Sequence, residues 1–189
     1  MAKRRDQVAY VLVISLAEIK PKIWRRFIVP SSITLKKLHV VLQRIMGWSD
    51  YHLHQFHTHL GNYGTPDPEY PDGTLSEARV RLDRFLIGEG DRILYEYDFG
   101  DGWVHELRLE RIVGPIEGEV VVECLDGARA CPPEDVGGPH AYQEFLRAIR
   151  DRKHPQHRNM RDWIGERFDS ESFNAKTVNR ELVPGWRRA

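Results

Sequence analysis

The stretch YDFGDGWVH at residues 97–105 predicts a tight β-hairpin. Its centre, Asp101-Gly102, is a strong two-residue hairpin signal, because a type I′ turn needs positive φ at both positions and this dipeptide tolerates it. A loop of that length places Asp98 directly across the ladder from His105. The fold is therefore expected to bring these two polar side chains together.

The outer part of the hairpin indicates that this pair is at least partly buried. Leu107 and Leu109 share a face with His105, and the register matches Leu109 with Leu94. Cross-strand Cβ atoms are about 5 Å apart, so Asp98 and His105 are expected to form a charge-assisted hydrogen bond. Such a bond orients a catalytic base or a metal ligand. The alternative is a structural pair that only ties the hairpin together.

Signals on either side of the hairpin predict an α+β fold. Strand composition or alternation occurs at residues 8–16, 23–29, 52–60, 92–99, 103–113 and 119–125. Helices are expected from Thr34 to Gly47, from Pro139 onward, near residues 160–168 and 175–182, and more weakly at 74–86. We expect one domain over residues 1–189. It would hold a mostly antiparallel sheet of about five to six strands, a helix packed on the sheet, and a C-terminal helical segment.

Composition limits the classes of function. Of the 189 residues, 41% are hydrophobic and 30% charged, and the formal net charge is zero, so no global field attracts nucleic acid or an anionic membrane. The N-terminal apolar run passes into Glu18 and Lys20 and is more typical of a strand than of a signal peptide. Two cysteines, Cys124 and Cys131, are too few for a secreted disulfide scaffold. A cytoplasmic protein without a membrane-spanning segment is expected.

The segment HLHQFHTH at residues 52–59 contains four histidines. On a strand His52 and His54 share one face, and His57 and His59 share the other. Histidines spaced by two can bind one ion, and zinc is a typical partner of such ligands. The alternative is that each histidine is solvated or separately hydrogen-bonded.

Two further segments carry charged groups in defined positions. In CPPEDVGGP at residues 131–139, prolines and glycines hold Glu134 and Asp135 on a stiff loop, where they can serve as acid–base groups, as hard-metal ligands or as a helix cap. The segment 147–161 is basic and can contact phosphates, or it is simply a solvated helix end. Its cationic residues are Arg147, Arg150, Arg152, Lys153, Arg158 and Arg161.

Taken in order, several motifs resemble the plasmid pRiA4b open-reading-frame-three-like family. They are PKIWRRFIVP, TLKKLHVVLQRIMGW, HLHQF, YDFGDGWVHELRLE and CPPEDVGGP, and the match runs in this order over roughly residues 8–182. The resemblance implies a compact α+β fold without an established activity. Some members carry plasmid, insertion-element or resolvase-like labels. The chain shows no recombinase motif, no phosphate-binding loop, no nucleophile elbow and no HExxH motif, so none of these activities is inferred.

The resemblance implies the same polar positions as the pattern analysis: His54, Asp98, Asp101, His105, Glu134 and Asp135. The first hypothesis is a site that binds a small molecule or a divalent metal such as zinc. In it Asp98, His105 and Glu134 are the catalytic candidates, His54, Asp101 and Asp135 bind ligand, and His54 and His105 are the metal candidates. The second hypothesis is a non-catalytic module that contacts nucleic acid or a protein through the basic segment from Arg147 to Arg161. The sequence leaves the choice between an enzyme and a binding protein open.

Overall fold

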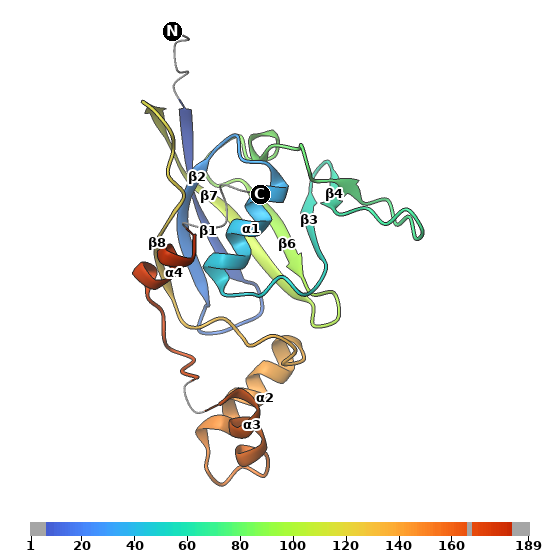
Figure 1. Ribbon diagram of the computed structural model, residues 1–189, viewed down its shortest axis with the longest axis vertical. Helices are drawn as coiled ribbons and strands as arrows, with labels where there is room; N and C mark the ends of the chain where they lie inside the picture. The colour runs from blue at the N-terminus through green and yellow to red at the C-terminus, as the bar shows by residue number, and fades with distance from the viewer. Residues whose placement is uncertain (1–6, 166–167, 183–189) are drawn as a thin grey trace.

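The computed structural model describes residues 7–165 and 168–182. Its centre is one eight-stranded sheet with the order β5-β4-β3-β6-β7-β1-β2-β8 (Figure 1). The strands are β1 (Gln7–Leu16), β2 (Trp24–Pro30), β3 (His54–Thr58), β4 (Gly61–Gly64), β5 (Leu75–Ser76), β6 (Arg92–Tyr97), β7 (Trp103–Ile116) and β8 (Glu123–Ala128). The α+β class and the mostly antiparallel sheet are confirmed. The predicted number of strands is wrong, because five to six were expected and the sheet has eight.

The two additional strands extend the β3 edge. Residues 61–64 lie outside the expected strands and form β4, whose Tyr63 lies opposite Phe56 and is buried with it. Residues 74–86, expected as a helix, instead contain β5 and a 3-10 turn, η1 (Leu82–Arg84). The unpaired edge of β4 supplies hydrogen-bond partners to Leu75 and Ser76 in a parallel pairing. Pairing across the sheet overrides the weak local helix preference here.

Strand β1 is central, as its apolar residues on both faces predict. It pairs with β2 on one side and with β7 on the other. Leu12 lies opposite Phe27 of β2 and Leu109 of β7, and all three side chains are fully buried. Strand β1 is therefore the centre of the core rather than an edge.

Helix α1 (Leu35–Met46) covers one face of the sheet (Figure 1). The Thr34 hydroxyl accepts a hydrogen bond from the Lys37 amide, and Gly47 ends the helix in the left-handed conformation, as predicted. Gln43 is a polar residue of this helix, yet only 2% of it is exposed. Its side chain donates to the Tyr95 hydroxyl and accepts from the Asp50 amide, which satisfies its polar atoms inside the fold.

The hairpin exists, but its register differs from the prediction by three residues. Tyr97 pairs with Trp103, and His105 lies opposite Tyr95 rather than Asp98. The reason is a wider loop: Asp98 has φ 57°, its carbonyl accepts from the Gly102 amide, and its carboxylate accepts from the Gly100 amide. Asp98 therefore belongs to the loop and not to the ladder. The predicted Asp98–His105 pair is wrong, although His105 does lie on the buried face.

Three more helices follow strand β8: α2 (Gly138–Arg150), α3 (His157–Ile164) and α4 (Ala175–Leu182). The helix expected from Pro139 onward is α2, and one of its faces is buried through Tyr142, Phe145, Leu146 and Ile149. Helices α2 and α3 pack together beyond the end of the sheet, whereas α4 lies against β8 and α1 (Figure 1). Residues 166–167 of the expected helix at 160–168 lie outside the described residues. No helix in the described part of the chain is long and apolar enough to cross a bilayer.

Candidate functional site

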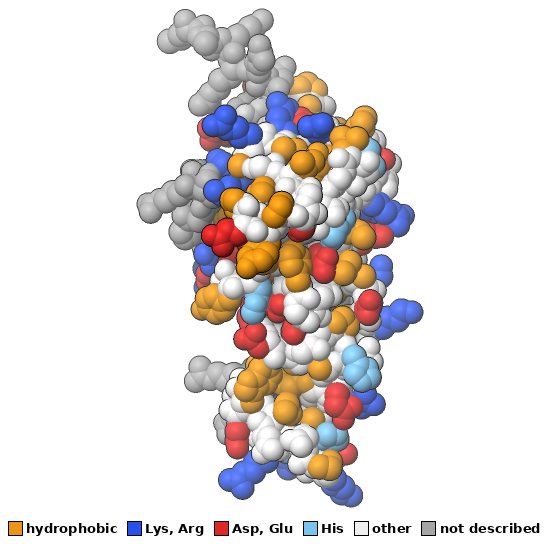
Figure 2. All heavy atoms as spheres, turned by 90° about the vertical axis from the view of Figure 1, so that its right-hand side faces the viewer, with side chains coloured by type: hydrophobic (Ala, Val, Ile, Leu, Met, Phe, Trp, Pro, Cys, Tyr) orange, Lys and Arg blue, Asp and Glu red, His pale blue; other side chains and the backbone are white. Residues whose placement is uncertain are grey.

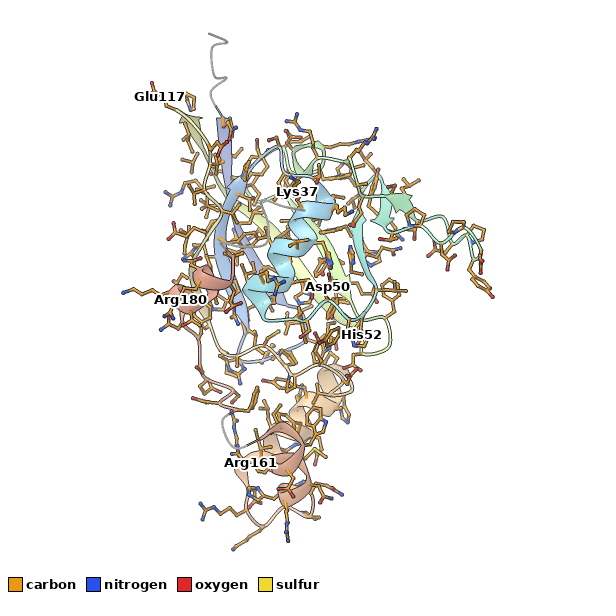
Figure 3. The ribbon with its side chains drawn as sticks, viewed as in Figure 1. Lys37, Asp50, His52, Glu117, Arg161 and Arg180 are labelled. Atoms are coloured by element: carbon orange, nitrogen blue, oxygen red, sulfur yellow. The ribbon has the colours of Figure 1, made fainter. Side chains whose placement is uncertain are left out.

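His52 is the centre of a polar site at the end of the sheet that faces α2 (Figure 3). Its Nε2 lies 3.2 Å from Asp135 Oδ1, 3.6 Å from Asp98 Oδ2 and 3.9 Å from Glu134 Oε2. Asp98 comes from the β6–β7 loop, whereas Glu134 and Asp135 come from the loop before α2. Three carboxylates from two distant segments therefore converge on one imidazole nitrogen.

The Asp98 carboxylate is fixed by the unusual shape of its own loop. Its Oδ1 accepts hydrogen bonds from the amides of Gly100, at 3.0 Å, and Asp101, at 3.3 Å. The Asp98 amide donates to the Leu53 carbonyl, which connects this loop to the segment that carries His52. One carboxylate oxygen is thus occupied by the backbone, and Oδ2 remains directed at His52.

The loop before α2 is fixed to the rest of the site by Glu134. Its Oε1 accepts from the Ser49 amide at 2.6 Å and from the Tyr97 hydroxyl at 3.1 Å. Burial, together with the neighbouring Glu134 carboxylate, raises the pKa of Tyr97 well above its ordinary value, so the hydroxyl stays protonated and remains a donor. Glu134 therefore contributes charge to the site while most of its hydrogen-bonding capacity positions the loop.

Asp101 and Asp135 have different roles in this loop contact. Asp101 Oδ2 accepts from the Gly137 amide at 3.0 Å, so this residue holds the hairpin loop against the start of α2. Asp135 makes no such backbone contact among the described residues, and 71% of its side chain is exposed. Its backbone has φ 57°, a conformation that costs an ordinary residue on the order of 1 kcal/mol or more. The strain places Asp135 Oδ1 beside His52.

The His52 ring supplies the clearest sign of a missing partner. Nε2 is buried, and none of the surrounding carboxylates has hydrogen-bond geometry toward it, so the atom has no hydrogen-bond partner in the described structure. Buried polar atoms are nearly always satisfied in proteins, so the surroundings of this atom call for an explanation. The ligand atoms of His52, Asp98 and Asp135 all lie within 4.8 Å of one another. That spacing allows a single cation to contact all three.

His105, a predicted member of the site, lies elsewhere in the core. It is 0% exposed, its Nδ1 donates to the Tyr95 carbonyl at 3.1 Å, and the edge of its ring faces Trp48. Burial lowers the pKa of His105 to about 4, so the ring is neutral at physiological pH. His105 therefore does not belong to the group formed by His52, Asp98 and Asp135.

His54 belongs to a second buried polar network. Its ring stacks on that of His39, with centroids 3.5 Å apart and an interplanar angle of 6°. His54 Nε2 contacts Glu77 at 3.0 Å, while His39 bridges the Tyr95 hydroxyl and Asp50, each at 2.8 Å. Burial and the adjacent His54 lower the pKa of His39. This network joins α1 to β3 and β6. Two of its members, Asp50 and His54, lie on either side of His52 in the sequence.

The sequence pattern thus found part of the site. Asp98, Glu134 and Asp135 meet, as the motif analysis expected, and Asp101 supports them. His52 was recognised only as half of a histidine pair, because strand periodicity placed it beside His54. The structure shows that β3 begins only at His54, so His52 lies in the segment before the strand and does not share the strand's periodicity.

The cysteines do not belong to the site. Cys124 and Cys131 are both free. Burial raises the pKa of Cys124 to about 11 and that of Cys131 further still, so neither is a thiolate at neutral pH. Cys124 is buried in the core, and Cys131 packs against it, so both are small packing side chains.

The resemblance noted in the sequence is confirmed. A model of the plasmid pRiA4b ORF-3-like proteins matches residues 8–177. The chain belongs to the plasmid pRiA4b ORF-3-like family. The YDFGDGWVH and CPPEDVGGP segments that led to this family are the two loops that build the His52 site.

Two relatives show how far the family likeness extends. The uncharacterised protein y4hQ of Sinorhizobium fredii is 38% identical over 182 residues, which cover 94% of this chain and 93% of that protein. The crystal structure of a protein of unknown function, MM3350 from Methanosarcina mazei Go1, superposes with a TM-score of 0.81 at 36% identity. It covers 92% of this chain and 99% of that one. These relatives establish the family and the fold, and their names describe no activity.

Proposed function

We propose that this protein binds a divalent cation through His52 Nε2, Asp98 Oδ2 and Asp135 Oδ1, and uses it to act on a small molecule. The observation that carries the proposal is the convergence of these three ligand atoms within 4.8 Å of one another. The ligand set replaces the His54 and His105 pair favoured by the sequence. Asp135 keeps the ligand-binding role expected for it, whereas Asp98, a catalytic candidate in the sequence, becomes a ligand of the cation. Glu134 is the nearby fourth group.

The chemistry of the donor atoms favours a cation over other occupants. Three carboxylates around one imidazole repel each other, and a divalent cation relieves that repulsion. One nitrogen with two or three carboxylate oxygens suits zinc, manganese or iron. The backbone hydrogen bonds to Asp98 Oδ1 orient the carboxylate from outside the site, as is usual for metal ligands.

The site also has room for chemistry. Three protein ligands leave coordination positions open, which is typical of catalytic rather than structural metal sites. Asp135 is mostly exposed, so the open side faces solvent. A cation held there activates a bound water or polarises a bound oxygen. Glu134 Oε2, at 3.9 Å from His52 Nε2, is placed to accept a proton from such a water.

Cation binding gives the direct test. Titration of purified protein with Mn²⁺, followed by calorimetry and by electron paramagnetic resonance, is expected to show one bound ion. The Asp135→Asn variant is expected to weaken binding by about 100-fold, because it removes a ligand charge. It keeps the backbone conformation, since Asn tolerates positive φ. His52→Ala should weaken binding equally.

The matched control is His57→Ala, since His57 lies on β3 but contacts Asn62 and Glu96 instead. This variant should bind Mn²⁺ like the wild type. If Asp135→Asn and His52→Ala both bind as tightly as the wild type, the proposed site is wrong.

The basic segment supports a second candidate function, contact with nucleic-acid phosphates. Arg150, Arg152, His157 and Arg161 line a hollow of about 670 Å³ between α2 and α3. Much of this charge is already engaged, because Arg150 pairs with Glu171 and Arg161 donates to the Ile149 carbonyl. The positions left for phosphate are therefore mainly Arg152 and Lys153.

A gel-shift experiment with duplex DNA and single-stranded RNA tests this second function. If it operates, binding should fall at least about tenfold between about 50 and about 200 mM salt. A protein carrying both Arg152→Ala and Lys153→Ala should bind nucleic acid more weakly than the wild type at low salt. A protein with Lys36→Ala and Lys37→Ala, on α1, is the charge-matched control. Absence of salt-sensitive binding rejects the nucleic-acid function.

A further inference from the structure

A cavity of about 450 Å³ lies directly beside the His52 site, between the loop before α2, helix α2 and helix α3. Its volume is within the roughly 300–1,000 Å³ range of small-molecule sites. The apolar part of its lining consists of Val136, Ala141, Phe145, Ala148, Met160 and Trp163. In Figure 2 hydrophobic side chains gather over the lower part of the molecule, at the height where Figure 1 places α2 and α3.

Two aromatic side chains, Phe145 and Trp163, form part of the apolar lining of the cavity. The rings of Phe145 and Trp163 are 5.7 Å apart and nearly perpendicular, at 84°. Phe145 is buried, whereas 49% of Trp163 is exposed. The pair therefore forms a firm wall that a flat ring can approach from solvent, and exposed tryptophans are typical of binding surfaces.

The charged groups around the cavity are not evenly distributed. Glu144 is neutralised locally, because it contacts Arg147 at 2.8 Å and His154 at 3.0 Å. Asp135 also lines the cavity and is a ligand of the proposed cation. His140, His154 and Gln156 complete the polar part of the lining, so the cavity is mostly apolar and shares Asp135 with the cation site.

We propose that this cavity binds the aromatic body of a small organic anion whose oxygen-containing head group, a carboxylate or a phosphate, ligates the cation at His52, Asp98 and Asp135. The inference rests on the proposed function and names the ligand class for it. The head group takes the open coordination positions, and the aromatic body lies against Phe145 and Trp163. A cation alone would leave the cavity without a role, whereas an amphipathic anion uses both parts.

Two hydroxamates test this arrangement, because both chelate a divalent cation and only one has an aromatic body. The Mn²⁺-loaded full-length protein is titrated with 2-naphthohydroxamate and with acetohydroxamate by calorimetry. The naphthyl compound is expected to bind at least about tenfold more tightly. Trp163→Ala and Ala141→Leu are expected to reduce that preference, the first by removing a wall and the second by filling space. Trp24→Ala, on β2 and outside the cavity lining, should retain it.

The controls separate this inference from the proposed function. Mn²⁺ binding is measured first, without any hydroxamate, and its absence would overturn the proposed function and this inference with it. If Mn²⁺ binds but both hydroxamates have equal affinity, only the inference fails. It also fails if the naphthyl compound binds equally well without Mn²⁺, or if its preference persists in both cavity variants.

Discussion

The Gly138→Ala variant is expected to have a free energy of unfolding roughly 3 kcal/mol below that of the wild type. Gly138 has φ +81°, and a β-carbon there would overlap the Asp101 carbonyl oxygen. Backbone atoms cannot yield as a flexible side chain would, so the start of α2 must move away from the hairpin loop. Asp135 is three residues earlier in the same loop, and its displacement should weaken Mn²⁺ binding at least about tenfold.

The chain offers a close control for this effect. Gly165 also has φ +81°, but among the described residues no atom outside its chain neighbours lies within 4 Å of the position that a β-carbon would occupy. Gly165→Ala therefore carries the conformational cost alone, about 1 kcal/mol, and should leave Mn²⁺ binding unchanged. Chemical denaturation of both variants measures the difference. Equal losses of stability would show that the contact between Gly138 and Asp101 does not fix the loop.

Acidification is expected to destabilise the protein through His105 by about 3 kcal/mol between pH 6.5 and 4. Burial lowers the pKa of His105 from its ordinary value near 6.5 to about 4. In that interval the unfolded chain binds a proton at this position and the folded chain does not. Stability is therefore complete above pH 6.5 and falls as the pH is lowered, by about 1.4 kcal/mol for each pH unit.

Denaturation curves collected across this pH range measure the effect. The His105→Gln variant lacks the titrating ring. Between pH 6.5 and 4 its free energy of unfolding should therefore fall by about 3 kcal/mol less than that of the wild type, whatever its stability at pH 7. His59→Gln is the control, because His59 is exposed near the end of β3 and should leave the pH dependence as it is. A pH profile of His105→Gln that parallels the wild type would show that His105 is not the source of the acid sensitivity.

The secondary structure near strong local signals was predictable from the sequence. Helix α1 begins after Thr34 and ends at Gly47 because a hydroxyl cap and a left-handed glycine act within a few residues of themselves. Strand β1 was recognisable as central because a strand buried on both faces is apolar on both. Strands β4 and β5 were missed, since their hydrogen bonds come from neighbouring strands rather than from their own sequence.

The hairpin shows the same limit within a single loop. An Asp-Gly pair favours a two-residue turn, yet the Asp98 side chain captures the Gly100 and Asp101 amides and widens the loop. That change moves Asp98 out of the ladder and toward His52, and it leaves His105 opposite Tyr95. A local pattern cannot weigh a side-chain hydrogen bond against an ideal turn.

By itself, the sequence determined the α+β class, the family, the main helices and strands, and the two loops that hold the carboxylates Asp98, Glu134 and Asp135. Only the tertiary structure decided that these loops meet at His52, while His54 and His105 are committed to the core. The physical reason is the distance along the chain. Periodicity reports which face a residue occupies, but the approach of residues 52, 98 and 135 depends on how the sheet places their three separate segments at one end.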